Sequence, residues 1–191
     1  MAVTPMGLTA PLMKEKHPDS RVVVVGPCAA KKLEASRESV RSEVDFVFTV
    51  EEIGAMFEAK GIDFASLKPD EADPFTQASS DGRGFAVSGG VAKAVVNCIK
   101  AKEPEREVLV ESAEGLANCK KMLKLAKSGK YDGYLLEGMA CPGGCVAGAG
   151  TLLPITRATT AVKKYTNSSD KLNANDSKYK DYLERLIEEY K

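Results

Sequence analysis

The sequence lacks any apolar run long enough to cross a bilayer. Its longest unbroken run, Val22–Val25, falls far short of the roughly 20 residues that a spanning helix needs. The N-terminus also lacks a basic region followed by an apolar stretch, so no secretion signal is recognised. We therefore expect a soluble, cytoplasmic protein that does not bind a membrane.

An excess of charge of either sign is absent as well. The 191 residues include 27 Lys and Arg and 27 Asp and Glu, which gives a formal net charge of zero. This balance excludes a strongly basic nucleic-acid binder and an acidic disordered tail. Hydrophobic residues make up 43% of the chain. They suffice for the core of one domain, or of two small lobes that share a core.

Strands and helices are expected to alternate along the chain. A β-branched strand over 21–26 (RVVVVG) should be buried on both faces of a sheet. Thr49 and Glu52 have the spacing of a capping box at the start of a helix through Lys60. Further strands are expected at 44–49, 107–111 and 131–137, further helices at 6–16, 89–102, 114–127 and 156–165, and a long surface loop at 68–84. This order predicts an α/β fold with a mostly parallel sheet flanked by helices. The domain is expected over 1–166, followed by a linker over 167–175 and a C-terminal helix over 176–191.

Histidine is scarce, and the number of cysteines is odd. The only histidine, His17, lies in a turn that ends a helix, where we expect a solvated side chain rather than a metal ligand. Five cysteines argue against a disulfide framework in a reducing compartment. Cys98 and Cys119 fall within apolar helical stripes, and we expect both to be small buried core residues.

The other three cysteines follow the ends of expected strands, where open α/β sheets tend to bind ligands. Cys28 comes directly after RVVVVGP, and Cys141 and Cys145 follow YLLEGMA. Gly143 and Gly144 have no Cβ, so the chain can wrap closely around a bulky group. Thiolates are the usual ligands of an iron–sulfur cubane, whereas structural zinc prefers tighter cysteine pairs with a second pair or histidines. The pattern favours an iron–sulfur site.

Two segments resemble the signature motifs of a known family. Residues 26–34 read GPCAAKKLE and residues 137–145 read EGMACPGGC. Both resemble motifs of iron-only (FeFe) hydrogenases, and residues 88–91 (SGGV) resemble a family segment between them. The resemblance spans essentially the whole chain and implies one lobe of the hydrogenase catalytic domain.

This resemblance implies a hydrogen-activating cluster. Cys28, Cys141 and Cys145 would bind its 4Fe–4S part, and Cys145 would also bridge to a two-iron unit with CO, cyanide and dithiolate ligands. Lys31 would stabilise a cyanide through a charge-assisted hydrogen bond. Glu34 would orient Lys31 or its loop, and Met139 would pack against the two-iron unit. The other motif residues would line the cofactor: Gly26, Pro27, Ala29, Ala140, Pro142, Gly143 and Gly144.

The sequence departs from the family pattern at two points. The family's upstream Thr-Ser-Cys motif, which supplies a further ligand and a proton-relay cysteine, has no match here. We therefore expect the C-terminal portion of a longer domain, without its cluster when isolated. An apolar surface should be left where the N-terminal lobe would pack, so self-association is expected. Gly26 stands where catalytic members carry methionine, and this glycine resembles the family's sensory branch.

Three functions follow from these observations. The first is reversible reduction of protons to H2 with electrons from ferredoxin or another electron-transfer protein, with the isolated chain inactive. The alternative is a module that senses hydrogen or redox state for a partner. A dithiol redox protein that uses Cys141 and Cys145 is disfavoured, because such motifs have a two-residue spacer at a helix start. Without the motifs, Lys31 and Glu34 would be interpreted as solvated side chains and Met139 as a core residue.

Overall fold

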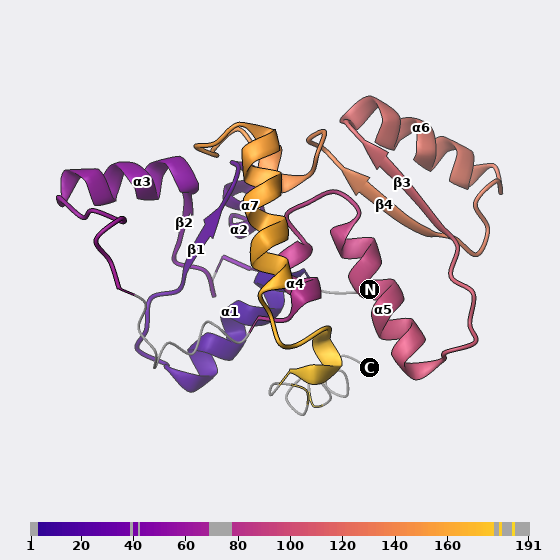
Figure 1. Cartoon of the computed structure of the whole chain (residues 1–191), viewed down its shortest axis with the longest axis horizontal. Helices are drawn as coiled ribbons and strands as arrows, with labels where there is room; N and C mark the ends of the chain where they lie inside the picture. Colours follow the sequence, from indigo (N-terminus) through magenta and orange to yellow (C-terminus); the bar gives the residue numbers. More distant parts are fainter. Residues whose placement is uncertain are drawn as a thin grey trace. The chain divides into compact units, whose positions relative to one another are not determined.

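The computed structural model describes residues 4–177 except 39, 42 and 69–77, together with Lys180 and Arg185. The chain divides into two compact units. Unit 1 is Met1–Lys68 with Gly148–Leu152, and unit 2 is Pro69–Ala147 with Leu153–Lys191. Each unit contains a two-stranded parallel sheet with helices beside it (Figure 1). The predicted α/β class with parallel strands is therefore confirmed, while the predicted domain limits at residues 166 and 175 stay predictions.

The sheet of unit 1 consists of two strands, one before and one after helix α2 in the sequence. Strand β1 (Val23–Gly26) pairs in parallel with β2 (Phe46–Thr49), from Val23 opposite Phe46 to Gly26 opposite Thr49. Its helices are α1 (Pro5–Lys16), α2 (Ala30–Ala35) and α3 (Val50–Ala59). The core combines residues of α1 with residues beside the strands, namely Met6, Ala10, Val40 and Val44, with Val22, Val24, Ala35 and Val47 packed against them.

The β-branched strand of unit 1 is covered on one face only. Val23 is 45% exposed and Val25 is 52% exposed, whereas Val24 packs against the core. Successive side chains of a strand point to opposite faces, and the cluster around α1 covers only the face that carries Val24. The prediction of a strand buried on both faces is therefore wrong. A run of four valines does not reveal how many layers cover it.

The capping box at the start of α3 is confirmed. The Thr49 hydroxyl accepts the backbone N–H of Glu52 at 3.1 Å, and the Glu52 carboxylate accepts the backbone N–H of Thr49 at 2.8 Å. These bonds satisfy two donors that a helix N-terminus otherwise leaves unpaired. As a result α3 begins directly at the carboxyl end of β2.

Unit 2 forms its sheet from β3 (Val110–Glu114) and β4 (Leu135–Met139), paired in parallel from Val110 opposite Leu135 to Glu114 opposite Met139. Both strands begin and end later than the sequence pattern predicts. Gly115 has a φ of +78° and ends β3, so the following helix starts at residue 116 rather than 114. The helices of unit 2 are α4 (Ser80–Gly84), α5 (Gly90–Lys102), α6 (Leu116–Lys127) and α7 (Ile155–Asn167), with short 3-10 turns η2 (Cys145–Ala147) and η3 (Ala174–Asp176).

The structure differs from the sequence-based expectation in the segment that precedes α5. The loop predicted over 68–84 contains helix α4, because the Ser79 side chain accepts the N–H of Gly82 at 3.1 Å and caps a turn there; residues 69–77 lie outside the described part. Most of the helix predicted over 176–191 also lies outside it.

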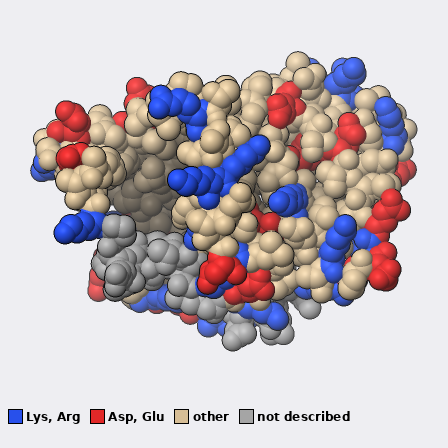
Figure 2. Space-filling model, viewed as in Figure 1, with Lys and Arg blue, Asp and Glu red and all other residues tan. Residues whose placement is uncertain are grey.

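Among the described residues, no helix has the length and apolar character to span a membrane. On the face shown in Figure 2, basic and acidic side chains are interspersed.

Asp45 joins three segments at the base of the unit 1 sheet. Its carboxylate accepts hydrogen bonds from Lys14 Nζ at 2.8 Å, from Arg21 Nη1 at 2.9 Å and from the backbone N–H of Val22 at 2.7 Å. The Lys14 hydrogen bond, followed by those from Val22 and Arg21, holds the pKa of Asp45 far below its usual value. The end of α1 is thereby connected to the residues that precede β1 and β2.

We expect Asp45→Asn to destabilise the chain in a pH-dependent way. Because the pKa of Asp45 is lower in the folded than in the unfolded chain, its stabilisation is complete above the unfolded pKa of about 4 and is lost as the pH falls below it. Urea unfolding should show the largest difference from the parent at neutral pH and a shrinking difference below about pH 4. Glu103→Gln, which removes an exposed ion pair with Arg106, serves as the control and should follow the parent. A parent–variant difference that stays constant from neutral to acid pH would contradict this role.

Candidate functional site

Cys28 lies at the carboxyl end of the unit 1 sheet. Strand β1 ends at buried Gly26, and Pro27 and the half-buried Cys28 connect it to α2. The Pro27 carbonyl accepts the N–H of Gly150 at 2.8 Å. A Cβ on Gly150 would lie only 3.2 Å from that same oxygen, so the two segments approach closely. This contact fixes the backbone one residue before the thiol.

Lys31 and Glu34 form an ion pair on the short helix that follows Cys28. Lys31 Nζ donates to Glu34 Oε2 at 2.6 Å, and the Thr4 hydroxyl donates to Glu34 Oε1. Partial burial would raise the pKa of Glu34, but the hydrogen bonds from Lys31 and Thr4 outweigh it and lower that pKa. The roles expected for Lys31 and Glu34 beside a cofactor stay predictions. Thr4 was missed from the sequence, because its 30-residue separation from Glu34 carries no local signal.

Cys141 and Cys145 lie together in one loop of unit 2. The loop begins where β4 ends at Met139, and Cys145 starts η2. Both thiols are half-buried. The Gly144 N–H donates to the Cys141 carbonyl at 3.0 Å, which bends the chain between the two cysteines. The two thiols therefore belong to one tight turn at the carboxyl end of a strand.

Only glycine fits at position 144. Its φ is +93°, a conformation that L side chains rarely adopt. A Cβ there would lie 2.8 Å from the Ala86 carbonyl oxygen and 2.9 Å from the Val87 carbonyl carbon. The loop thus lies directly against the backbone of residues 86–88.

Two carboxylates hold this part of unit 2 together. Glu137 is only 7% exposed, and its oxygens accept the N–H groups of Gly89 at 2.6 Å and Ala92 at 2.9 Å. Glu114 accepts the N–H of Gly143 at 3.1 Å. A hydrogen bond from the Ser88 side chain, followed by this one, lowers the pKa of Glu114. Neither glutamate was predicted as a functional residue. The sequence signal that could have indicated Glu137 is its position, because it is an acid at the end of the apolar run YLLE.

The remaining predicted residues have simpler surroundings. Ala29, Ala140 and Pro142 are exposed residues beside the thiols, and Met139 is half-buried at the end of β4. His17 is exposed and caps α1 with its backbone N–H, which donates to the Met13 carbonyl at 2.9 Å.

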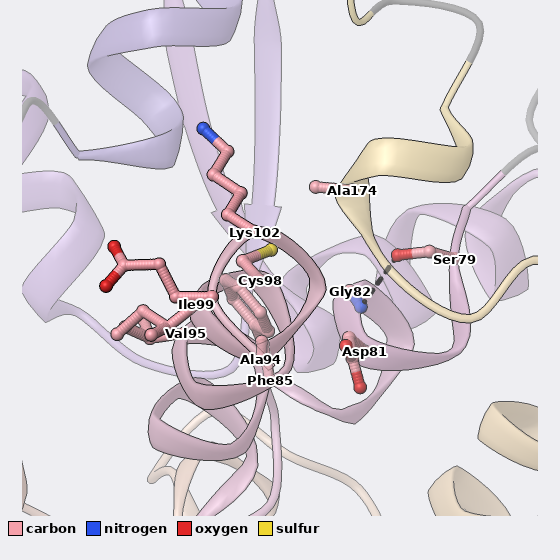
Figure 3. A pocket seen from close by; sticks show the side chains of 11 residues that line it. Ser79, Asp81, Gly82, Phe85, Ala94, Val95, Cys98, Ile99, Lys102 and Ala174 are labelled. Atoms are coloured by element: carbon pink, nitrogen blue, oxygen red, sulfur yellow. Dashed lines mark hydrogen bonds between the residues drawn. The ribbon is translucent and has the colours of Figure 1, made fainter. Parts of the chain in front are cut away.

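Cys98 and Cys119 are half-buried, so they are less enclosed than expected. The Cys119 thiol donates to the Ala113 carbonyl at 3.4 Å, which joins α6 to β3. Cys98 lies on α5 beside a cavity of about 380 Å³ between α4, α5 and η3 (Figure 3). Neither cysteine lies in the loops that carry the other three.

The donor set suits an iron–sulfur cluster. Cys28 in unit 1 and Cys141 and Cys145 in unit 2 all follow the carboxyl end of a parallel strand, and thiolates are the usual ligands of iron–sulfur clusters. The backbone turn at Gly144, closed by its N–H bond to the Cys141 carbonyl, keeps the two thiols of unit 2 within one loop. Within the described ranges, no group of three or more His, Cys, Asp or Glu side chains is arranged to hold a metal ion.

Comparison with known proteins identifies the family. Residues 1–149 match the family described as the iron-only hydrogenase large subunit, C-terminal domain. Because this match covers well over half of the chain, the protein belongs to that family.

Its relatives include both hydrogenases and assembly proteins. The periplasmic Fe hydrogenase large subunit of Nitratidesulfovibrio vulgaris is 29% identical, over 77% of this chain and 44% of that protein. Cytosolic iron-sulfur assembly component 3 of Mus musculus is also 29% identical, over 68% of this chain and 35% of that protein. A solved FeFe-hydrogenase structure, concerned with oxygen inactivation and degradation of the 2Fe subcluster, has a TM-score of 0.67 and 22% identity over 93% of this chain and 62% of that one. The chain thus spans less than half the length of these two curated relatives.

Gly144→Ala should destabilise the chain more than a glycine substitution elsewhere. Gly133→Ala is the matched control, because Gly133 also has a positive φ, +80°, but no atom lies within 4 Å of a Cβ built there. We expect the control to cost about 1 kcal/mol from the backbone conformation alone. Gly144→Ala should cost roughly 1–3 kcal/mol more, since its methyl group would collide with residues 86–88. Urea unfolding measures both; equal losses would show that the contact is unimportant.

Proposed function

We propose that this chain supplies part of the cluster-binding site of an FeFe-hydrogenase, which reversibly reduces protons to H2. The observation that carries the proposal is the turn at the end of β4, which places two half-buried thiols on one loop and closes with a glycine at a φ of +93°. A third thiol, Cys28, follows the end of β1 in the other unit. All three lie in the segments that resemble motifs of iron-only hydrogenases, and within the residues that match the family.

In this proposal Cys28, Cys141 and Cys145 would hold a 4Fe–4S cluster, and Cys145 would also help to hold a two-iron unit with CO, cyanide and dithiolate ligands. When bound, that group supplies the electron-transfer and hydrogen chemistry. The chain's contribution is to hold and orient it. The motif residues around the thiols would line the cofactor, and the flexible thioether of Met139 would pack against it.

Lys31 contributes a fixed positive charge. Its ammonium is held by Glu34, whose other oxygen accepts the Thr4 hydroxyl. An ammonium has three N–H donors, so Lys31 can bind an anionic ligand such as cyanide while it keeps its bond to Glu34. Glu34 in turn restricts where the ammonium can lie.

The partners follow from the family. A ferredoxin-type protein would deliver electrons, and an N-terminal lobe with a further ligand would complete the site, so the chain alone is proposed to be inactive. We also propose a cytoplasmic location; one named relative is periplasmic and another is cytosolic.

A sensory role is the second candidate, and Gly26 favours it. A Cβ on Gly26 would lie 3.3 Å from Lys31 Cγ, so this glycine lets the lysine stem lie over the end of β1. Hydrogen evolution with reduced methyl viologen separates the two roles. Sustained turnover by the completed protein supports the hydrogenase, and an assembled cluster with very slow turnover supports the sensor.

Anaerobic reconstitution tests the ligand assignment. Iron and acid-labile sulfide content and the electron paramagnetic resonance spectrum of the reduced sample are measured for the parent, Cys145→Ala and Cys98→Ala. In whichever form the parent binds the cluster, alone or with an N-terminal lobe, we expect about four irons per chain with a cubane signal in the parent and in Cys98→Ala. Cys145→Ala should lose most of this iron, because a ligand is removed.

Equal iron in Cys145→Ala and in the parent would contradict the assignment. If the parent binds no iron, the same three chains are compared with an N-terminal hydrogenase lobe co-expressed. Failure of the parent to bind iron in that complex would reject the proposed function.

A further inference from the structure

Glu137 is a buried carboxylate that caps a helix belonging to another part of the chain. It lies on β4 opposite Ser112, and its two oxygens accept the N–H groups of Gly89 and Ala92, 48 and 45 residues away. Gly89 is the N-cap of α5, and no side chain of its own caps that helix. Glu137 therefore supplies the acceptors and the negative charge that a helix N-terminus favours.

The residues just before α5 hold the thiol loop. The Ser88 N–H donates to the Gly143 carbonyl at 3.1 Å, and the Val146 N–H donates to the Ala86 carbonyl at 3.0 Å. These bonds fasten the loop on both sides of Gly144. Any movement of residues 86–88 is thus passed to the segment between Cys141 and Cys145.

Glu114 fastens the same two segments from the neighbouring strand. It ends β3 opposite Met139, accepts the Gly143 N–H at 3.1 Å and takes a hydrogen bond from the Ser88 side chain. Glu114 thus bridges residue 88 to residue 143 beside the backbone bond that joins them. Unlike Glu137, it is exposed.

We propose that Glu137 and Glu114 are positioning residues that together set the conformation of the loop carrying Cys141 and Cys145. Pro142 fixes only its own φ, whereas Gly143 and Gly144 have wide conformational freedom, so the half of the loop nearer Cys145 needs a restraint from outside the loop. The two carboxylates supply that restraint, one through the start of α5 and one directly on Gly143. The consequence for cluster retention rests on the proposed function; the restraint on the loop does not.

Amide hydrogen exchange of the apo chain, resolved by residue with NMR, tests the restraint without iron. The variants are Glu137→Gln and Glu114→Ala. Glu111→Ala is the control, because Glu111 lies on the same strand as Glu114 but its carboxylate accepts a hydrogen bond from the Tyr131 hydroxyl, which is not part of the thiol loop. We expect the Ser88 and Val146 amides to exchange roughly tenfold faster or more in both variants, as opening of the loop becomes easier. Exchange in β1 and β2 should stay at the parental rate.

A purely structural role would give a different pattern. It would speed exchange throughout unit 2 in proportion to the loss of stability, measured as the urea midpoint. Uniform acceleration of that kind, or parental exchange at Ser88 and Val146, would overturn the proposal. If Glu137→Gln shows no cooperative unfolding transition, Glu114→Ala decides the question, because its exposed side chain can be removed without opening the core.

The reconstituted protein tests the consequence. Iron release to a ferrous chelator should be about fivefold faster or more in Glu114→Ala than in Glu111→Ala, because a loosened loop holds its thiolates less firmly. Parental iron release together with parental exchange would reject the restraint. Faster exchange in a chain that binds no iron even with an N-terminal lobe co-expressed would reject the proposed function and leave the restraint standing.

Discussion

The parallel pairing of β3 with β4 is the interaction on which the thiol loop of unit 2 depends. Its register places Glu114 opposite Met139, so both strands end at the same edge. From that edge Glu114 reaches the Gly143 N–H, and the chain turns directly into Cys141. The residue before Met139, Gly138, lies close to α6, because a Cβ at this position would lie 3.3 Å from the Cys119 sulfur. A shift of one residue in register would reverse the faces of these side chains and remove the Glu114 contact.

The sequence predicted well the features that depend on neighbouring residues. It predicted poorly the features that depend on residues distant in the chain. The capping box of Thr49 and Glu52 is a three-residue pattern, and it forms as expected. The helices over 6–16 and 89–102 match α1 and α5 closely. The strands expected at 107–111 and 131–137 are β3 at 110–114 and β4 at 135–139, because their limits are set by mutual pairing rather than by apolar runs. Ser112 and Gly138 are weak strand formers that the pairing retains.

The same distinction applies to the site. Motif spacing predicts the three thiols as ligands, which stays a prediction, and the i, i+3 spacing of Lys31 and Glu34 is realised as an ion pair. The partners of those residues are distant in sequence: Thr4 lies 30 residues from Glu34, and Gly89 lies 48 residues from Glu137. No local pattern encodes such contacts. The one signal that could have indicated a role for Glu137 is an acid at the end of an apolar strand, since a buried carboxylate requires hydrogen-bond donors.

Gly26 shows how one absent side chain can affect a charged residue five positions away. The Lys31 stem passes over Gly26. A Cβ at position 26 would lie 3.3 Å from Lys31 Cγ, which is closer than ordinary van der Waals contact. Any side chain at this position would therefore require the Lys31 stem to shift by a few tenths of an ångström. Because Glu34 is itself held by Thr4, the displaced ammonium could not simply carry its partner with it. Gly26 and the Thr4–Glu34 hydrogen bond thus jointly restrict where the Lys31 ammonium can lie.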